Sequence, residues 1–74
     1  LEGKKIVVSG IFKSYSREQL INIIEINGGE IKSSVSSNVS FIVAGDKMGI
    51  SKKNKAIELN IPIITENDFT NLIS

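Results

Sequence analysis

The 74-residue sequence has no cysteine, no histidine and no tryptophan, and only one proline, one tyrosine and three phenylalanines. Without cysteine, the chain can form neither a disulfide nor a thiolate site. Without histidine, it lacks the commonest general base and the commonest zinc ligand. No apolar run approaches the roughly 18 to 20 residues of a membrane-spanning helix, and no segment resembles a signal peptide. The sequence also has no glycine-rich nucleotide loop and no obvious pair of catalytic carboxylates, so these absences argue against an enzyme.

The length predicts one small domain, near the lower limit at which a single hydrophobic core is sufficient. Apolar residues make up 41% of the chain and charged residues 23%, which is ordinary for a globular domain. Because aromatic residues are few, the core must be built mainly from aliphatic side chains. We expect residues 1–74 to form a single domain. Since the chain does not begin with methionine, we expect that domain to have been cut from a longer protein.

Positive and negative charges are distributed unevenly along the chain, although the net charge is only +1. Residues 1–57 contain all nine lysines and arginines and five of the eight acidic residues, which gives a net charge of +4. Residues 58–74 contain the other three acidic residues and no cation, which gives −3. Solvated faces of a small protein would explain this distribution. The alternative, left open by the sequence, is that one side of the fold is biased toward an anion.

The apolar pattern predicts secondary structure in the order β-α-β-β-α-β-α. Strands are expected over residues 5–9, 30–35, 41–44 and 61–64. Three polar residues are expected to cap the helices at their N-termini, namely Ser16 with Gln19, Ser51 before a helix over 52–59, and Thr65 with Asp68. Gly28 is expected to adopt the left-handed conformation that ends the first helix.

Strands separated by helices favour an α/β fold with a parallel sheet covered on both faces. The runs 6–8 and 41–44 are the most apolar, so they are expected to form the central strands. The segment 30–35 alternates with polar residues and is expected to be a short edge strand.

Four residues combine into a candidate phosphate site. Ser9 and Gly10 close the first strand, and open parallel sheets bind ligands beyond the carboxyl ends of their strands. Arg17 and Lys52 each follow the expected cap of a helix. A phosphate there could accept hydrogen bonds from the Ser9 hydroxyl and the Gly10 N–H, with Lys52 and Arg17 supplying positive charge. Taken singly, the same residues are compatible with a plain turn and two solvated cations.

Several segments of the chain resemble the BRCT family. They are residues 1–10 (LEGKKIVVSG), 16–18 (SRE), 27–29 (NGG), 34–45 (SVSSNVSFIVAG), 51–56 (SKKNKA) and 59–64 (LNIPII). Because they occur in order and without gaps, the resemblance covers essentially the whole chain. Within the family, the chain is most similar to the domain at the C-terminus of bacterial NAD-dependent DNA ligases, and it also resembles that of the large subunit of replication factor C. The loop over 45–49 is the most ligase-like segment.

The resemblance implies a single four-stranded parallel sheet flanked by three helices, with the first and third helices on one face and the second on the other. It also implies a phosphate pocket formed by Ser9, Gly10, Arg17 and Lys52. In the clamp-loader relatives this pocket holds the 5′-phosphate of duplex DNA, whereas in tandem BRCT repeats it holds a phosphoserine. Ser9 stands where threonine is common, and Phe69 stands where many members have tryptophan.

Two functions are compatible with these observations. The first is a non-catalytic, phosphate-recognising DNA-binding domain of a NAD-dependent DNA ligase in replication and repair. Its partners would be duplex DNA with 5′-phosphate ends or nicks and the other domains of the parent protein, with no membrane contact, in the bacterial cytoplasm near the nucleoid. The domain itself would need no cofactor, since NAD and a divalent metal are expected only in the parent ligase. The alternative is a protein-interaction or phosphopeptide-binding module, although phosphopeptide binding usually needs two repeats.

Overall fold

The computed structural model describes residues 2–73 as a four-stranded, entirely parallel sheet with three helices. The elements follow the expected order, with bounds β1 (Lys5–Ser9), α1 (Arg17–Ile26), β2 (Glu30–Ile31), β3 (Phe41–Ala44), α2 (Ile50–Glu58), β4 (Ile63–Thr65) and α3 (Glu66–Ile73). The strand order in the sheet is β2-β1-β3-β4, so the prediction that β1 and β3 are central is confirmed. Leu1, the first residue of the family resemblance, lies outside the described residues.

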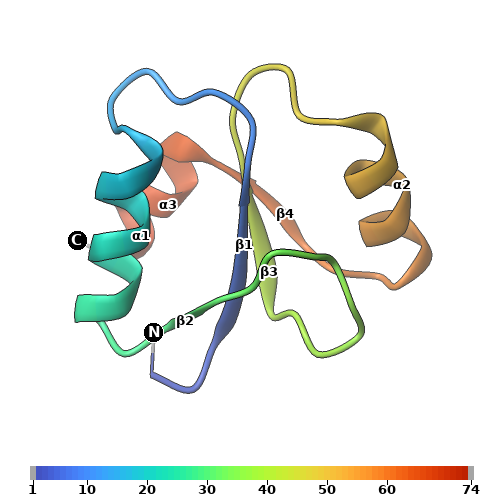
Figure 1. Cartoon of the computed structure of the whole chain (residues 1–74), viewed down its shortest axis with the longest axis horizontal. Coiled ribbons are helices and arrows are strands. Elements are labelled where there is room, and N and C mark those ends of the chain that lie inside the picture. Colours follow the sequence, from blue (N-terminus) through green and yellow to red (C-terminus); the bar gives the residue numbers. More distant parts are fainter. Residues whose placement is uncertain (1, 74) are drawn as a thin grey trace.

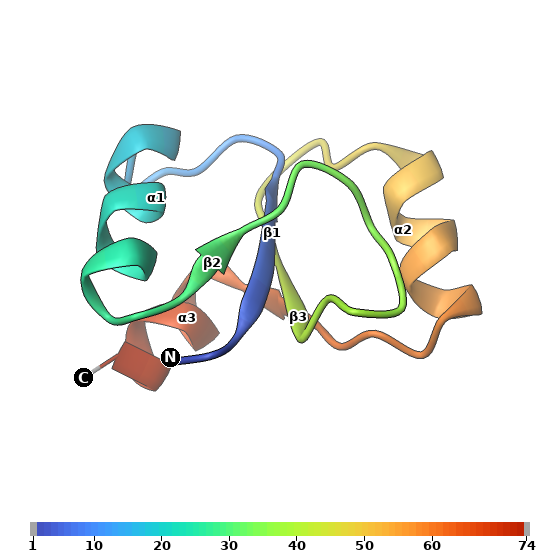
Figure 2. The same ribbon diagram turned by 60° about the horizontal axis from the view of Figure 1, so that its bottom comes forward.

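The helices cover both faces of the sheet, as expected. Figure 1 shows α1 and α3 together on one side of the strands and α2 on the other, and Figure 2 shows the same separation after rotation. Strand side chains point alternately to the two faces. One buried cluster lies under α1 and α3 and contains Ile6, Val8, Leu20, Ile24, Val43 and Phe69. A second lies under α2 and contains Val7, Val39, Ile42, Ala56 and Ile61.

The predicted caps of the first and third helices are confirmed. The Ser16 hydroxyl accepts from the Gln19 N–H at 3.1 Å, and the Gln19 side chain accepts from the Ser16 N–H at 2.8 Å. At α3, the Thr65 hydroxyl accepts from the Asp68 N–H at 3.1 Å, and the Asp68 carboxylate accepts from the Thr65 N–H at 3.3 Å. These reciprocal bonds satisfy N–H groups that have no partner inside a helix.

The prediction that Ser51 caps the second helix is wrong. Helix α2 begins at Ile50, and its N-cap is Gly49 with φ −64° and ψ 138°, without a side-chain hydrogen bond at the cap. Extended backbone is what an N-cap requires, and glycine is nearly as favourable there as threonine. Because Gly49 already provides this conformation, Ser51 becomes the second residue of the helix and Lys52 the third.

Two strands are shorter or later than predicted. Strand β2 covers only Glu30–Ile31 of the expected 30–35. Strand β4 begins at Ile63, two residues after the expected start, because Ile61 is buried under α2 and its N–H donates to the Ala56 carbonyl at 2.8 Å. Within residues 2–73, no helix has the length and apolar character needed to cross a membrane.

The prediction for Gly28 is confirmed, since its φ is +86°. Its neighbour Gly29 explains why α1 packs closely on β1. A Cβ at Gly29 would lie 2.6 Å from Cγ2 of Ile24 and 3.3 Å from Cδ1 of Ile6, so helix, turn and strand meet where only glycine fits.

Candidate functional site

The two central strands end at the same edge of the sheet, and the loops that follow them cross each other there. Figure 1 shows the β1–α1 loop and the β3–α2 loop together at the upper end of the sheet. Ile11 and Asp46 each donate an N–H to the carbonyl of the other, both at 2.8 Å. The Gly45 N–H also donates to the Ser9 carbonyl at 2.8 Å. The candidate phosphate site therefore stands on two loops that hold one another.

Glycine is required on both sides of this crossing. Gly10 has a φ of +97°, and a Cβ there would lie 2.8 Å from the Asp46 carbonyl oxygen. A Cβ at Gly45 would overlap the carbonyl oxygen of Ile11. Gly10 thus has a structural role in the loop crossing, in addition to any contact that its N–H makes with a ligand.

Ser9 and Lys52 lie on the same side of the sheet. Ser9 is two residues after Val7, which packs under α2, so strand alternation places the Ser9 side chain on the α2 side. Lys52 lies one helical turn before the buried Ala56 and is half-buried, whereas Lys53 and Lys55 are exposed. Among residues 2–73, Ser9 is the only buried polar residue, with 6% exposure.

Arg17 reaches the same edge from the opposite layer. It is the first residue of α1, which packs on the other face of the sheet, and its side chain is exposed. The four predicted residues therefore share the carboxyl edge of the sheet but not one face. A phosphate contacting all of them would have to sit above the edge, between α1 and α2.

The cations of the candidate site have no carboxylate partner within residues 2–73. The salt bridges in this range are Lys13 with Asp46 at 3.9 Å and Lys32 with Glu30 at 3.2 Å. Helix α2 has no acidic residue in its first turn, in contrast to α1 and α3. Lys52 therefore adds positive charge at a helix N-terminus that has no side-chain cap, which is a combination suited to an anion, and Arg17 adds positive charge beside the capped N-terminus of α1.

Sequence reasoning missed Glu66, the residue that fixes the β1–α1 loop. Its carboxylate accepts three successive backbone N–H groups, from Lys13 at 3.3 Å, Ser14 at 2.7 Å and Tyr15 at 3.1 Å. More than 50 residues separate Glu66 from this loop. The only sequence signal was an acidic residue in the first turn of a helix, which favourable interaction with the helix dipole already explains.

Tyr15 attaches the same loop to α3 at a second point. Its hydroxyl lies 2.9 Å from the Thr70 hydroxyl. Its ring stands edge-on to the Phe69 ring, with centroids 6.4 Å apart and an interplanar angle of 86°. The β1–α1 loop is thus anchored to α3 at two points, Glu66 and Thr70.

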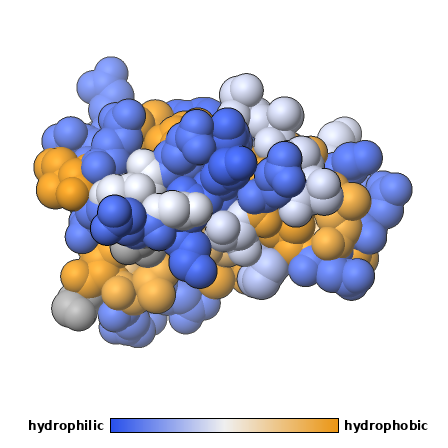
Figure 3. Space-filling view, turned by 90° about the horizontal axis from the view of Figure 1, so that it is seen from below, coloured by the Kyte–Doolittle hydropathy of each residue, from blue (hydrophilic) through white to orange (hydrophobic). Residues whose placement is uncertain are grey.

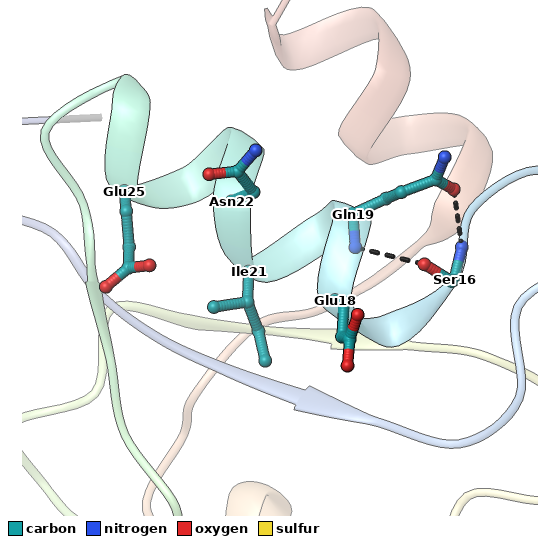
Figure 4. Close-up of a pocket in the computed structure, with 6 residues that line it drawn as sticks. All are labelled: Ser16, Glu18, Gln19, Ile21, Asn22 and Glu25. Atoms are coloured by element: carbon teal, nitrogen blue, oxygen red, sulfur yellow. Dashed lines mark hydrogen bonds between the residues drawn. The ribbon is translucent and has the colours of Figure 1, made fainter.

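Two other hollows in the surface are poorly suited to phosphate. Figure 4 shows one along α1, where Glu18, Ile21 and Glu25 point to the same side of the helix and Asn22 to another. Its two carboxylates would repel an anion. The other is an apolar hollow lined by Phe41, Pro62, Ile64 and Leu72, among others. It lies toward the amino ends of the strands, the edge seen in Figure 3, where apolar and polar atoms are interspersed.

Comparison with known proteins agrees with the fold. The family model described as "BRCA1 C Terminus (BRCT) domain" matches residues 1–73. A DNA ligase of Flavobacterium johnsoniae is 52% identical over 67 residues, which are 90% of this chain and 10% of the ligase. DNA ligases of Flavobacterium psychrophilum and Porphyromonas gingivalis are 46% and 47% identical over 100% and 99% of this chain, and over 11% of their own lengths. The chain spans about a tenth of the relatives that it matches. By this match and by its sheet topology, the chain belongs to the BRCT family and corresponds to the BRCT segment of bacterial DNA ligases.

Proposed function

We propose that this chain is the non-catalytic, DNA-binding domain of a NAD-dependent DNA ligase acting in replication and repair. The observation that carries the proposal is the carboxyl edge of the sheet, where β1 ends at Ser9 and Gly10, where α1 begins with Arg17 and where the first turn of α2 carries Lys52. Neither cation forms a salt bridge with a carboxylate among residues 2–73. The similarity to bacterial DNA ligases supports a DNA phosphate as the ligand. NAD and a divalent metal are expected in other domains of the parent ligase, and a cytoplasmic, nucleoid-associated location follows from the same proposal.

Binding of this kind depends on phosphate and not on base sequence. The Ser9 hydroxyl and the Gly10 N–H donate to the phosphate oxygens, Lys52 neutralises charge, and Arg17 binds oxygens in a fork. A 5′-terminal phosphate carries more charge and more free oxygens than a phosphate within the backbone. The site is therefore expected to favour a duplex end or a nick with a 5′-phosphate.

Lys52→Ala is expected to remove the preference for a 5′-phosphorylated duplex. Wild-type protein should bind that duplex more tightly than the same duplex with a 5′-hydroxyl, and the variant should bind both equally. Fluorescence anisotropy at several salt concentrations measures both affinities. The slope of log affinity against log salt should decrease in magnitude by about 0.9, as expected for one lost phosphate contact.

Lys53→Ala is the matched control, because Lys53 is the next residue of α2 but is exposed. It removes the same charge and should keep the 5′-phosphate preference. Equal losses in both variants would mean that general positive charge, and not a phosphate site, attracts DNA. If wild-type protein binds both duplexes equally and without salt dependence, the DNA proposal fails and a protein partner becomes the better explanation.

A further inference from the structure

The Glu66 carboxylate is an internal anion at the candidate phosphate site. Oε1 accepts from the N–H groups of Ser14 and Tyr15, at 2.7 and 3.1 Å, and Oε2 accepts from the N–H of Lys13 at 3.3 Å. Successive backbone N–H groups that converge on one point form a concave anion-binding nest. Here the protein fills that nest with its own carboxylate.

The nest lies in the middle of the β1–α1 loop, whose two ends carry Gly10 and Arg17, two of the four residues of the candidate site. Gly10 begins the β1–α1 loop, and Arg17 follows its last residue, Ser16. At one end, the loop is tied to Asp46 through Ile11, and at the other end it is fixed by the capping box of α1. Between these points, residues 13–15 are held by the Glu66 carboxylate and by the contact of the Tyr15 hydroxyl with Thr70 of α3. Without Glu66, three N–H groups in a row lose a charged acceptor.

We propose that Glu66 is a positioning residue for phosphate binding, holding the β1–α1 loop in the conformation that places Gly10 and Arg17 at the carboxyl edge. This inference rests on the proposed function. Glu66 acts through the loop backbone and makes no contact with the phosphate. Its role is to supply a fixed acceptor, so that the loop does not have to become ordered when DNA binds.

The sign of the effect separates positioning from simple electrostatics. A carboxylate near a phosphate site repels the ligand, so Coulomb's law alone predicts tighter DNA binding when Glu66 is neutralised. Positioning predicts weaker binding. The two outcomes have opposite directions, so the change in DNA affinity distinguishes them even if it is small.

Two substitutions of Glu66 separate its charge from its acceptor role. Both Glu66→Ala and Glu66→Gln remove the negative charge. Glutamine keeps one carbonyl oxygen, and in the structure a single oxygen, Oε1, serves both Ser14 and Tyr15. We expect Glu66→Ala to weaken binding of a 5′-phosphorylated duplex roughly tenfold, which corresponds to the free energy of one hydrogen bond from a backbone N–H to a charged acceptor. Glu66→Gln should recover most of this loss.

Asp68→Ala is the matched control for both charge and stability. Asp68 is in the same first turn of α3, and its carboxylate accepts one N–H from Thr65 at 3.3 Å, whereas the Glu66 carboxylate accepts three from the β1–α1 loop. This variant should bind the duplex as well as wild type does, or slightly better. Thermal melting of each variant identifies a temperature at which all are folded, and the affinities are compared there.

Amide hydrogen exchange and formate give readouts that do not depend on DNA. In Glu66→Ala, the amides of Ser14 and Tyr15 should exchange roughly tenfold faster than in wild type. Formate, which can enter the vacated nest, should restore both this protection and DNA affinity, relative to chloride at the same ionic strength. Asp68→Ala should show neither effect.

The outcomes distinguish this inference from the proposed function. If wild-type protein prefers the 5′-phosphorylated duplex but Glu66→Ala binds it equally well or more tightly, the positioning role is refuted and the phosphate site stands. The positioning role is also refuted if alanine and glutamine lose affinity equally and formate restores none of it. If wild-type protein shows neither a preference for the phosphorylated duplex nor salt dependence, the proposed function fails, and with it the positioning role.

Discussion

Replacing Gly45 with alanine should cost about 3 kcal/mol of unfolding free energy or more. The new Cβ would overlap the Ile11 carbonyl oxygen, an atom of the backbone that cannot turn away as a side chain can. Relieving the overlap requires the two loops to separate, which lengthens or breaks the hydrogen bonds between Ile11 and Asp46. Overpacking costs about 1–3 kcal/mol, and each backbone group left unsatisfied adds about 1–3 kcal/mol. The total unfolding free energy of a domain of 74 residues is roughly 4–11 kcal/mol.

Chemical denaturation of Gly45→Ala and Gly49→Ala measures this effect against a control on the same loop. A Cβ at Gly49 would meet no atom within 4 Å, and the residue has an ordinary negative φ. Its replacement should cost less than about 1 kcal/mol, the usual difference between good and poor N-caps. If the two variants lose similar stability, close contact at the loop crossing is not what requires glycine at position 45.

Replacing Phe69 with alanine should destabilise the domain by about 3–5 kcal/mol. Its side chain is fully buried in the cluster under α1 and α3, where it is the largest of the fully buried residues. The substitution also removes the ring against which Tyr15 packs. Since Tyr15 anchors the β1–α1 loop, phosphate binding should decrease even at temperatures where the variant remains folded.

Leu72→Ala is the control for Phe69→Ala, because Leu72 is on the same helix but is 52% exposed. We expect it to cost less than about 1 kcal/mol, with unchanged DNA affinity. Unfolding in urea, followed by circular dichroism, measures the two losses of stability, and anisotropy measures DNA affinity. A small loss in Phe69→Ala, comparable to that of Leu72→Ala, would contradict the central place given to this ring in the core.

Features set by local sequence could be predicted well. The parallel sheet with β1 and β3 in its centre follows from short apolar strands separated by helices. The caps at Ser16 and Thr65 follow from polar pairs three residues apart, and the left-handed turn at Gly28 follows from its place after a helix. In each case, residues close in sequence determine the geometry.

Features set by contacts between distant residues could not be predicted. The acceptor role of Glu66 depends on a loop more than 50 residues away. The need for glycine at positions 10 and 45 arises because two loops cross, which no local pattern records. Ser51 illustrates a local ambiguity, since Gly49 offered another acceptable N-cap two residues earlier. One edge of the sheet carries Ser9, Gly10, Arg17 and Lys52, and their role as a phosphate site stays a prediction.

The shortness of the outer strands has a consequence for the behaviour of the domain in a crowded cell. Strand β2, at one edge of the sheet, has two residues, and the charged residues Glu30 and Lys32 lie along it. Strand β4, at the other edge, has three residues and is preceded by Pro62, which has no N–H. A strand of a neighbouring chain could form few backbone hydrogen bonds with either edge strand. One edge is also charged, and the other is preceded by a proline, which cannot donate a hydrogen bond. Many copies of the domain can therefore lie close together without joining into larger sheets.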